Sequence, residues 1–147
     1  MIKFCNSLTI LSDAKKVFSY LSKLENFSKW NYAIKSVTKL EPEISDKNSL
    51  YQLCREVNGK EMFENVSITE YVQDQKISMS VSGGWFPYSM CYEISPLENS
   101  GGVLLKNHAK IEPTGIFHIF LRSKFIQNNL KNAVNQNLQV LKQQLEE

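Results

Sequence analysis

The chain begins with an alternation of apolar and polar positions, which is typical of a strand with one buried face. The apolar members are Ile2, Phe4, Leu8 and Ile10, and the polar members between them are Lys3, Ser7 and Thr9. A helical spacing follows, in which apolar positions recur at i, i+3, i+4 and i+7, namely Ala14, Val17, Phe18 and Leu21. The pattern predicts a strand over residues 2–10 and then a short helix with Ser12 as its N-cap.

The segment LENFSKWNYAIKSV, residues 24–37, carries three large aromatic side chains in a stretch rich in Asn, Ser and Lys. They are Phe27, Trp30 and Tyr32. The segment predicts a second short helix over about residues 24–30 and then a strand through residues 34–40. Aromatic rings supply large apolar area with few rotatable bonds, and Trp and Tyr also keep a polar group. The three rings therefore either recognise a partner molecule or simply fill the core.

The dipeptide Asn58-Gly59 between two alternating runs is the strongest local hairpin signal in the chain, because a type I′ turn needs two residues that tolerate positive φ. A two-residue loop there pairs Val57 with Lys60, Arg55 with Met62, Leu53 with Glu64 and Tyr51 with Val66. Directly paired residues share a face of the sheet. The face expected to be buried consists of Tyr51, Leu53, Arg55, Val57, Met62, Glu64, Val66 and Ile68.

Three further turns continue the same apolar face. A turn at Asp74-Gln75 places Ile77, Met79 and Val81 beside Val72, Glu70 and Ile68. A turn at Gly83-Gly84 then adds Phe86, Tyr88, Met90, Tyr92 and Ile94. An even-length loop within residues 96–102 adds Val103, Leu105, Asn107, Ala109 and Ile111. Because a wrong register in any hairpin would exchange the two faces, this agreement predicts one continuous antiparallel sheet.

After Pro113-Thr114-Gly115 the spacing becomes helical and stays so to the end of the chain. The apolar positions are Phe117, Leu121, Phe125, Leu130, Val134, Leu138, Leu141 and Leu145. About thirty residues of helix would be near 45 Å long. We expect this helix to pack on the sheet. A coiled-coil partner is the alternative, but the heptad-like spacing covers only residues 134–145.

The composition describes an ordinary globular chain of 147 residues, 42% hydrophobic and 22% charged, which fits one domain over residues 1–147. A net charge of +2, spread along the chain, disfavours nucleic acid and is too weak to argue for an anionic membrane. The opening residues lack the apolar region of a signal peptide, and no apolar run approaches the roughly 20 residues that span a bilayer. We therefore expect a cytoplasmic protein without a membrane span.

The cysteines and histidines suggest no cofactor. Cys5, Cys54 and Cys91 are an odd number without a CxxC spacing, which argues against a disulfide framework and a zinc site. His108 falls on the outward parity of its strand, and His118 lies near the start of the last helix. Two histidines ten residues apart, without converging carboxylates or thiols, are weak evidence for a metal site. We expect neither metal nor other cofactor.

Three stretches resemble a known family: SLTILSDAKKVFSYLSKLENFSKW (7–30), YEISPLENSGGVLLKNHAKIEPTG (92–115) and the terminal helix. On them the chain resembles the SRPBCC superfamily of START-like and Bet v 1-like proteins, and within it the polyketide cyclase/dehydrase and lipid-transport group. The resemblance implies an α+β helix-grip fold, in which a curved antiparallel sheet of six to seven strands, two short helices and one long C-terminal helix enclose a hydrophobic cavity. Such proteins often carry a glycine before the third strand, and residues 42–49, PEISDKNS, contain none.

Within such a cavity the polar positions of the apolar face become the informative ones. Arg55 and Glu64 would be diagonal neighbours across the first hairpin, within reach of each other. A buried charge costs several kcal/mol unless it is paired, so the pair either neutralises itself or lets Arg55 anchor a carboxylate or other polar ligand group. Tyr88 and Tyr92 could join Glu64 and Arg55 in acid–base chemistry if they line the cavity.

The resemblance leaves three functions open. The first is binding or transport of a hydrophobic small molecule or lipid, the second is an enzyme of the polyketide cyclase/aromatase kind, and the third is a protein-interaction partner. For the first two, the residues expected at the ligand are Phe27, Trp30, Tyr51, Arg55, Glu64, Met79, Tyr88, Tyr92, Asn107 and Phe125.

Overall fold

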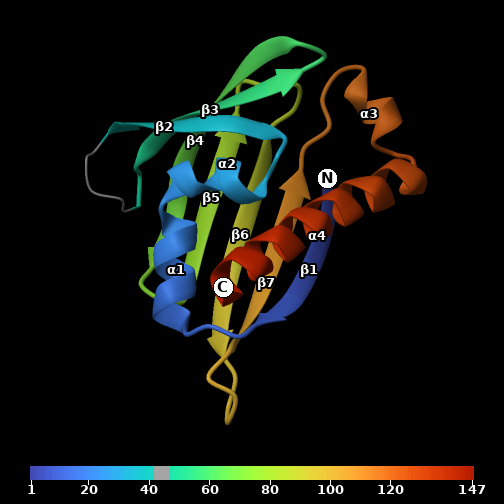
Figure 1. Cartoon of the computed structure of the whole chain (residues 1–147). Coiled ribbons are helices and arrows are strands. Elements are labelled where there is room, and N and C mark those ends of the chain that lie inside the picture. Colours follow the sequence, from blue (N-terminus) through green and yellow to red (C-terminus); the bar gives the residue numbers. More distant parts are fainter. Residues whose placement is uncertain (42–46) are drawn as a thin grey trace.

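The computed structural model describes residues 1–41 and 47–147 and confirms the expected α+β architecture, a seven-stranded antiparallel sheet with helices packed on one face (Figure 1). The strands are β1 (Ile2–Ile10), β2 (Ile34–Glu41), β3 (Leu50–Val57), β4 (Lys60–Val72), β5 (Lys76–Ser82), β6 (Tyr88–Pro96) and β7 (Val103–Ile111). The helical elements are α1 (Ala14–Ser22), η1 (Leu24–Asn26), α2 (Phe27–Trp30), α3 (Phe117–Phe120) and α4 (Lys124–Glu146). Most of the glycine-free segment before β3, residues 42–46, lies outside the described residues.

The spatial order of the strands is β1-β7-β6-β5-β4-β3-β2, so the first strand closes the sheet beside the last one. The predicted register of the first hairpin is confirmed, with Val57 opposite Lys60 and Leu53 opposite Glu64. Its turn works as expected, because Asn58 and Gly59 adopt φ angles of 51° and 79°. The loop between β6 and β7 also keeps the predicted parity, with Ile94 opposite Leu105.

The predicted register between β4 and β5 is wrong. Val72 pairs with Lys76 across a three-residue turn in which Asp74 takes a φ of 62°, whereas the two-residue turn would have paired it with Ile77. A β-bulge between Ile68 and Glu70 then restores the parity, so that Ile68 faces Met79. As a result Val72 and Glu70 are exposed.

The connection between β5 and β6 is longer than predicted but preserves the inner face. Val81 pairs with Tyr88, so the chain between them forms a wide loop around Gly83-Gly84. Because the number of residues between the paired positions is still even, Tyr88, Met90 and Tyr92 keep the expected parity.

Helix α1 begins one residue later than predicted. Asp13, not Ser12, is the N-cap: its backbone is extended, and its carboxylate accepts a hydrogen bond of 2.7 Å from the Lys16 backbone N–H. The predicted apolar face is confirmed, since Val17, Phe18 and Leu21 are buried in the main core.

The single C-terminal helix that the spacing predicts is divided into α3 and α4 (Figure 1). The break lies at Arg122-Ser123, where the Ser123 backbone is extended with φ −68° and ψ 125°. Gln127 stabilises the break, because its side-chain amide donates a hydrogen bond of 2.7 Å to the Leu121 carbonyl. Beyond the break, α4 packs on the inner face of the sheet and buries Leu138 and Leu141, as expected for a helix on a sheet rather than for a coiled coil.

Candidate functional site

A cavity of about 350 Å³ lies between the inner face of the sheet and helices α2 and α4. Its wall is mostly apolar and takes at least one side chain from every strand. The volume falls at the lower end of the roughly 300–1,000 Å³ that is typical of small-molecule sites.

The two halves of α4 explain why space is left under it. Leu138 and Leu141, in the C-terminal half, are fully buried in the main core. Leu130 and Val134, in the N-terminal half, are only partly buried and line the cavity together with the short side chain of Ala133. This half of the helix therefore roofs the cavity without filling it.

The cavity reaches the protein surface. Four of its lining residues are exposed: Ala33 before β2, Glu56 in the β3–β4 hairpin, Trp85 in the β5–β6 loop and Ala133 on α4. These positions belong to separate segments of the chain. We call the exposed part of the cavity wall that they form the cavity mouth.

A polar cluster of Arg55, Glu64 and Tyr88 lies in the cavity wall. The Arg55 Nε donates to a Glu64 carboxylate oxygen at 2.5 Å, which confirms the predicted contact between these diagonal neighbours. The Arg55 Nη2 donates to the Tyr88 hydroxyl at 2.5 Å. Glu64 is almost fully buried with its side chain 3% exposed, whereas the Arg55 side chain is 21% exposed. The two opposite charges neutralise each other inside an apolar wall.

Gly84 lies against the Glu64 side chain. A Cβ at position 84 would lie 2.9 Å from the Glu64 Cδ and closer still to one carboxylate oxygen. Only glycine allows this approach, so the wide β5–β6 loop fixes the position of the carboxylate. The sequence predicts a turn at Gly83-Gly84 but not this contact.

The cluster presents hydrogen-bond donors to the cavity. Burial raises the pKa of Tyr88, and the neighbouring Arg55 offsets only part of this rise, so the phenol is protonated at neutral pH. Because the Tyr88 oxygen accepts from Arg55, its own proton is available for another acceptor. Within the described part of the chain, Arg55 uses two of its roughly five N–H groups, those that bond Glu64 and Tyr88.

A second polar point of the wall is Asn137 on α4. Its side chain is buried and lines the cavity, and its Oδ1 has no hydrogen-bond partner among the described residues. A buried polar atom without a partner costs about 1–3 kcal/mol, so a ligand that bonds it would recover this free energy. Asn137 was not predicted as a site residue. It lies three residues after Val134 on the apolar stripe of the helix, where a polar side chain indicates a special role.

Six of the ten residues expected at the ligand line the cavity, and their contact with a ligand stays a prediction. They are Phe27, Arg55, Glu64, Met79, Tyr88 and Tyr92. Trp30 lies behind this wall, with its ring centroid 4.8 Å from that of Phe27 and 6.2 Å from that of Tyr92. Tyr51 and Asn107 are fully buried and do not line the cavity.

The structure corrects the placement of Phe125 and Tyr32. Phe125 is exposed in the first turn of α4, because the break at Ser123 interrupts the apolar stripe of the predicted helix. Tyr32 lies in the turn after α2 and is also exposed, so it is neither cavity wall nor core.

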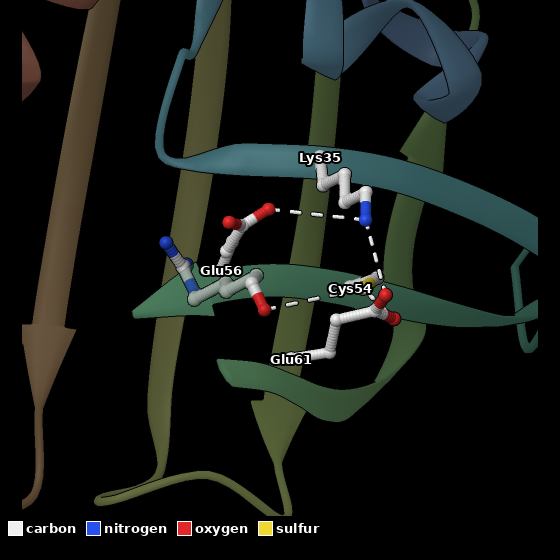
Figure 2. A network of polar contacts seen from close by, with 5 residues as sticks. Lys35, Cys54, Glu56 and Glu61 are labelled. Carbon is white, nitrogen blue, oxygen red and sulfur yellow. Dashed lines mark hydrogen bonds and ion pairs between the residues drawn. The ribbon is translucent and has the colours of Figure 1, made fainter. Parts of the chain in front are cut away.

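A network of polar side chains joins β2, β3 and β4, and its member Glu56 also lines the cavity (Figure 2). The Lys35 ammonium lies 3.0 Å from a Glu61 oxygen and 3.8 Å from a Glu56 oxygen. The Cys54 thiol donates to Glu61 at 3.4 Å, and burial followed by this hydrogen bond raises the pKa of the thiol. Cys54 is therefore a neutral thiol at pH 7, and the network ties Glu56 at the mouth to the neighbouring strands.

The described residues contain no group of three or more His, Cys, Asp or Glu side chains placed to hold a metal ion. His108 pairs with Glu93 at 3.1 Å and does not line the cavity, in keeping with its predicted outward parity. Among the helices of the described ranges, none has the length and apolar character to cross a membrane.

No family model and no curated protein matches the chain, but solved structures do. A START superfamily protein from Mycobacterium smegmatis is similar with a TM-score of 0.78 at 17% identity, covering 98% of this chain and 97% of that chain. Ara h 8.0201 is similar with a TM-score of 0.73 at 14% identity, covering 98% and 97%. The di-domain ARO/CYC StfQ from the steffimycin biosynthetic pathway has a TM-score of 0.73 at 12% identity, covering 99% of this chain and 50% of that chain.

Likeness at such low identity shows the fold. The chain thus has the helix-grip fold of START-like and Bet v 1-like proteins, and the fold implied by the sequence resemblance is confirmed. Within this fold, the wall of the 350 Å³ cavity carries the cluster of Arg55, Glu64 and Tyr88.

Proposed function

We propose that the protein binds a hydrophobic small molecule or lipid that carries an uncharged hydrogen-bond acceptor, such as a carbonyl group. The apolar body of this ligand occupies the cavity, and its acceptor meets Arg55 and Tyr88. The observation that carries the proposal is the donor-rich Arg55–Tyr88 pair in a mostly apolar wall. A few placed polar groups in an apolar pocket are the usual way to fix the orientation of a ligand.

The charge balance of the cluster favours an uncharged acceptor over a carboxylate. Glu64 already neutralises Arg55, so a ligand carboxylate would place a second negative charge beside a single guanidinium in a poorly solvated wall. Uncompensated buried charge costs several kcal/mol. A carbonyl oxygen accepts hydrogen bonds from the free N–H groups and from the Tyr88 hydroxyl without this cost.

The proposal is tested with two ligands that differ only in the acceptor, a long-chain ketone and the alkane of equal length. Each competes with a fluorescent apolar probe for the purified protein. We expect the wild type to prefer the ketone, and we expect the double variant Arg55→Leu/Glu64→Leu to lose at least tenfold of this preference. The double variant removes both charges together, so no unpaired charge is left in the wall.

Met79→Leu, a nearly volume-conserving change in the apolar wall, is the matched control and should keep the preference. Equal affinity of the wild type for ketone and alkane would overturn the assignment of the polar cluster. Failure of both ligands to displace the probe, together with native mass spectra free of any co-purifying small molecule, would overturn ligand binding itself.

An enzyme of the polyketide cyclase/aromatase kind is the second candidate. The Tyr88 hydroxyl and the Arg55 N–H groups would polarise a ligand carbonyl, and the Glu64 carboxylate lies beside them as a candidate base. The di-domain ARO/CYC protein StfQ shares the fold at 12% identity. Turnover of a poly-β-ketone substrate by the wild type, lost in Glu64→Gln, would favour this candidate over a carrier.

A further inference from the structure

Residues 116–125 display large apolar side chains to solvent, which the cavity does not explain. Ile116, Ile119, Phe120 and Phe125 are 71%, 77%, 59% and 73% exposed. We call these four residues the apolar tip. Ile119 and Phe120 lie in α3, and Ile116 directly precedes this helix. Four such side chains within ten residues form more than the scattered exposure that is normal for a surface.

The tip is held in this exposed arrangement by packing on its other side. Leu121, directly after Phe120, is buried in a small cluster with Ile2 and Ile111. Ile126, directly after Phe125, packs on the same cluster. The middle and the C-terminal end of the segment are therefore anchored to β1 and β7, while the four side chains of the tip stay exposed.

Along the tip segment itself, the formal charges are all positive. Between Glu112 and Glu146 the sequence contains no acidic residue, whereas Arg122 and Lys124 lie within the tip segment and Lys131 follows in the next turns of α4. These three basic side chains are exposed. Within the part of the chain that the structure describes, neither Arg122 nor Lys124 makes an ion pair. The weak net charge of the whole chain hides this local concentration.

The tip also lies at the end of the molecule that carries the cavity mouth. Phe86 lines the cavity and packs on the cluster that contains Leu121. The Glu112 backbone N–H, at the start of the segment that leads to α3, donates to the Pro87 carbonyl at 2.9 Å. The β5–β6 loop, which bears Trp85 at the mouth, is therefore tied to the base of the tip.

We propose that the apolar tip is a membrane-docking surface that inserts into the headgroup region of an anionic lipid bilayer, with Arg122 and Lys124 against the lipid phosphates. Apolar side chains beside basic ones are the combination that binds peripheral proteins to anionic membranes. A second copy of this chain fits the same surface less well, because a symmetric contact would bring Arg122 and Lys124 close to their own copies. The proposal stands on the surface alone and does not depend on what the cavity holds.

Vesicle flotation tests the docking surface directly. We use vesicles of phosphatidylcholine alone and of phosphatidylcholine with phosphatidylglycerol at a ratio of three to one. We expect the wild type to float with the anionic vesicles, and we expect Ile119→Ser/Phe120→Ser to lower its partition coefficient at least tenfold. Each basic residue near an anionic surface contributes a factor of about five, so Arg122→Gln/Lys124→Gln should weaken anionic binding and leave neutral vesicles unaffected.

The matched control is Leu40→Ser/Phe63→Ser, which removes a similar pair of exposed side chains from β2 and β4. This control should float like the wild type. Unchanged flotation of the tip variant, or equal loss in the control, would overturn the proposal. So would a wild type that ignores vesicles and forms dimers that the tip variant abolishes, because the surface would then bind a second copy. Ketone binding, measured without vesicles, reports separately on the cavity.

Discussion

The ion pair between Arg55 and Glu64 makes a sharp prediction about stability. Arg55→Leu leaves the Glu64 carboxylate, 3% exposed, without its cation in an apolar wall. Removal of one partner from a buried ion pair costs about 3–5 kcal/mol, because the remaining charge is uncompensated. We expect Arg55→Leu to lower the free energy of unfolding by about 3 kcal/mol, the lower end of this range, since part of the cavity wall around Glu64 is exposed.

Removal of the other partner, Glu64, should lower the free energy of unfolding by less. Glu64→Leu leaves Arg55, whose side chain is 21% exposed and keeps its hydrogen bond to Tyr88, so the unpaired charge is better solvated. The double variant Arg55→Leu/Glu64→Leu removes both charges, and apolar replacement of a buried pair is often close to neutral. We expect it to lie within about 1 kcal/mol of the wild type.

Urea unfolding followed by circular dichroism measures all four proteins and closes the double-variant cycle. Additive losses in the double variant would show that the two side chains do not compensate each other and would refute the reasoning. A loss below about 1 kcal/mol in Arg55→Leu would do the same, because the Glu64 carboxylate would then be solvated rather than held in the wall.

Three further predictions concern the same cavity. Gly84→Ala should lower the free energy of unfolding by about 1–3 kcal/mol in the same urea assay, because the new methyl group overlaps the Glu64 carboxylate. Asn137→Leu should raise stability by roughly 1 kcal/mol, because it removes a buried oxygen without a partner, while ligands with a second polar group bind less tightly in the competition assay. Burial raises the pKa values of Tyr88 and Tyr92 above the ordinary value of 10.0, so the unfolded chain loses these protons first and stability should fall as the pH rises above 10. Unfolding between pH 8 and 11 checks this fall, which should be smaller in Tyr92→Phe.

The sequence predicts the sheet well where local chemistry decides the geometry. Asn58-Gly59 imposes a two-residue turn, and the alternation around it then places Arg55 and Glu64 on one face within reach of each other. The predicted register fails where the sequence is compatible with more than one turn length. The segment around Asp74 accommodates a three-residue turn plus a bulge as easily as the two-residue turn, and periodicity alone does not distinguish them.

The site residues also divide into those that the local sequence pattern predicts and those that it does not. Arg55, Glu64 and Tyr88 are visible in the sequence because charged or phenolic groups on an apolar face are conspicuous. Phe125 was misplaced because the helical spacing continues across the break at Ser123, which depends on a backbone conformation and a Gln127 hydrogen bond rather than on apolar pattern.

The amino-acid order by itself determined most of the residues that face inward, since the two-residue period of a strand and the 3.6-residue period of a helix are local properties. It also placed Arg55 and Glu64 on the inward face within reach of each other. Only the tertiary structure decided that the N-terminal half of α4 leaves about 350 Å³ unfilled, that Gly84 closes on Glu64, and that the apolar tip projects from the mouth end. Volume, close approach and exposure depend on how distant segments pack against one another, and no local period encodes that packing.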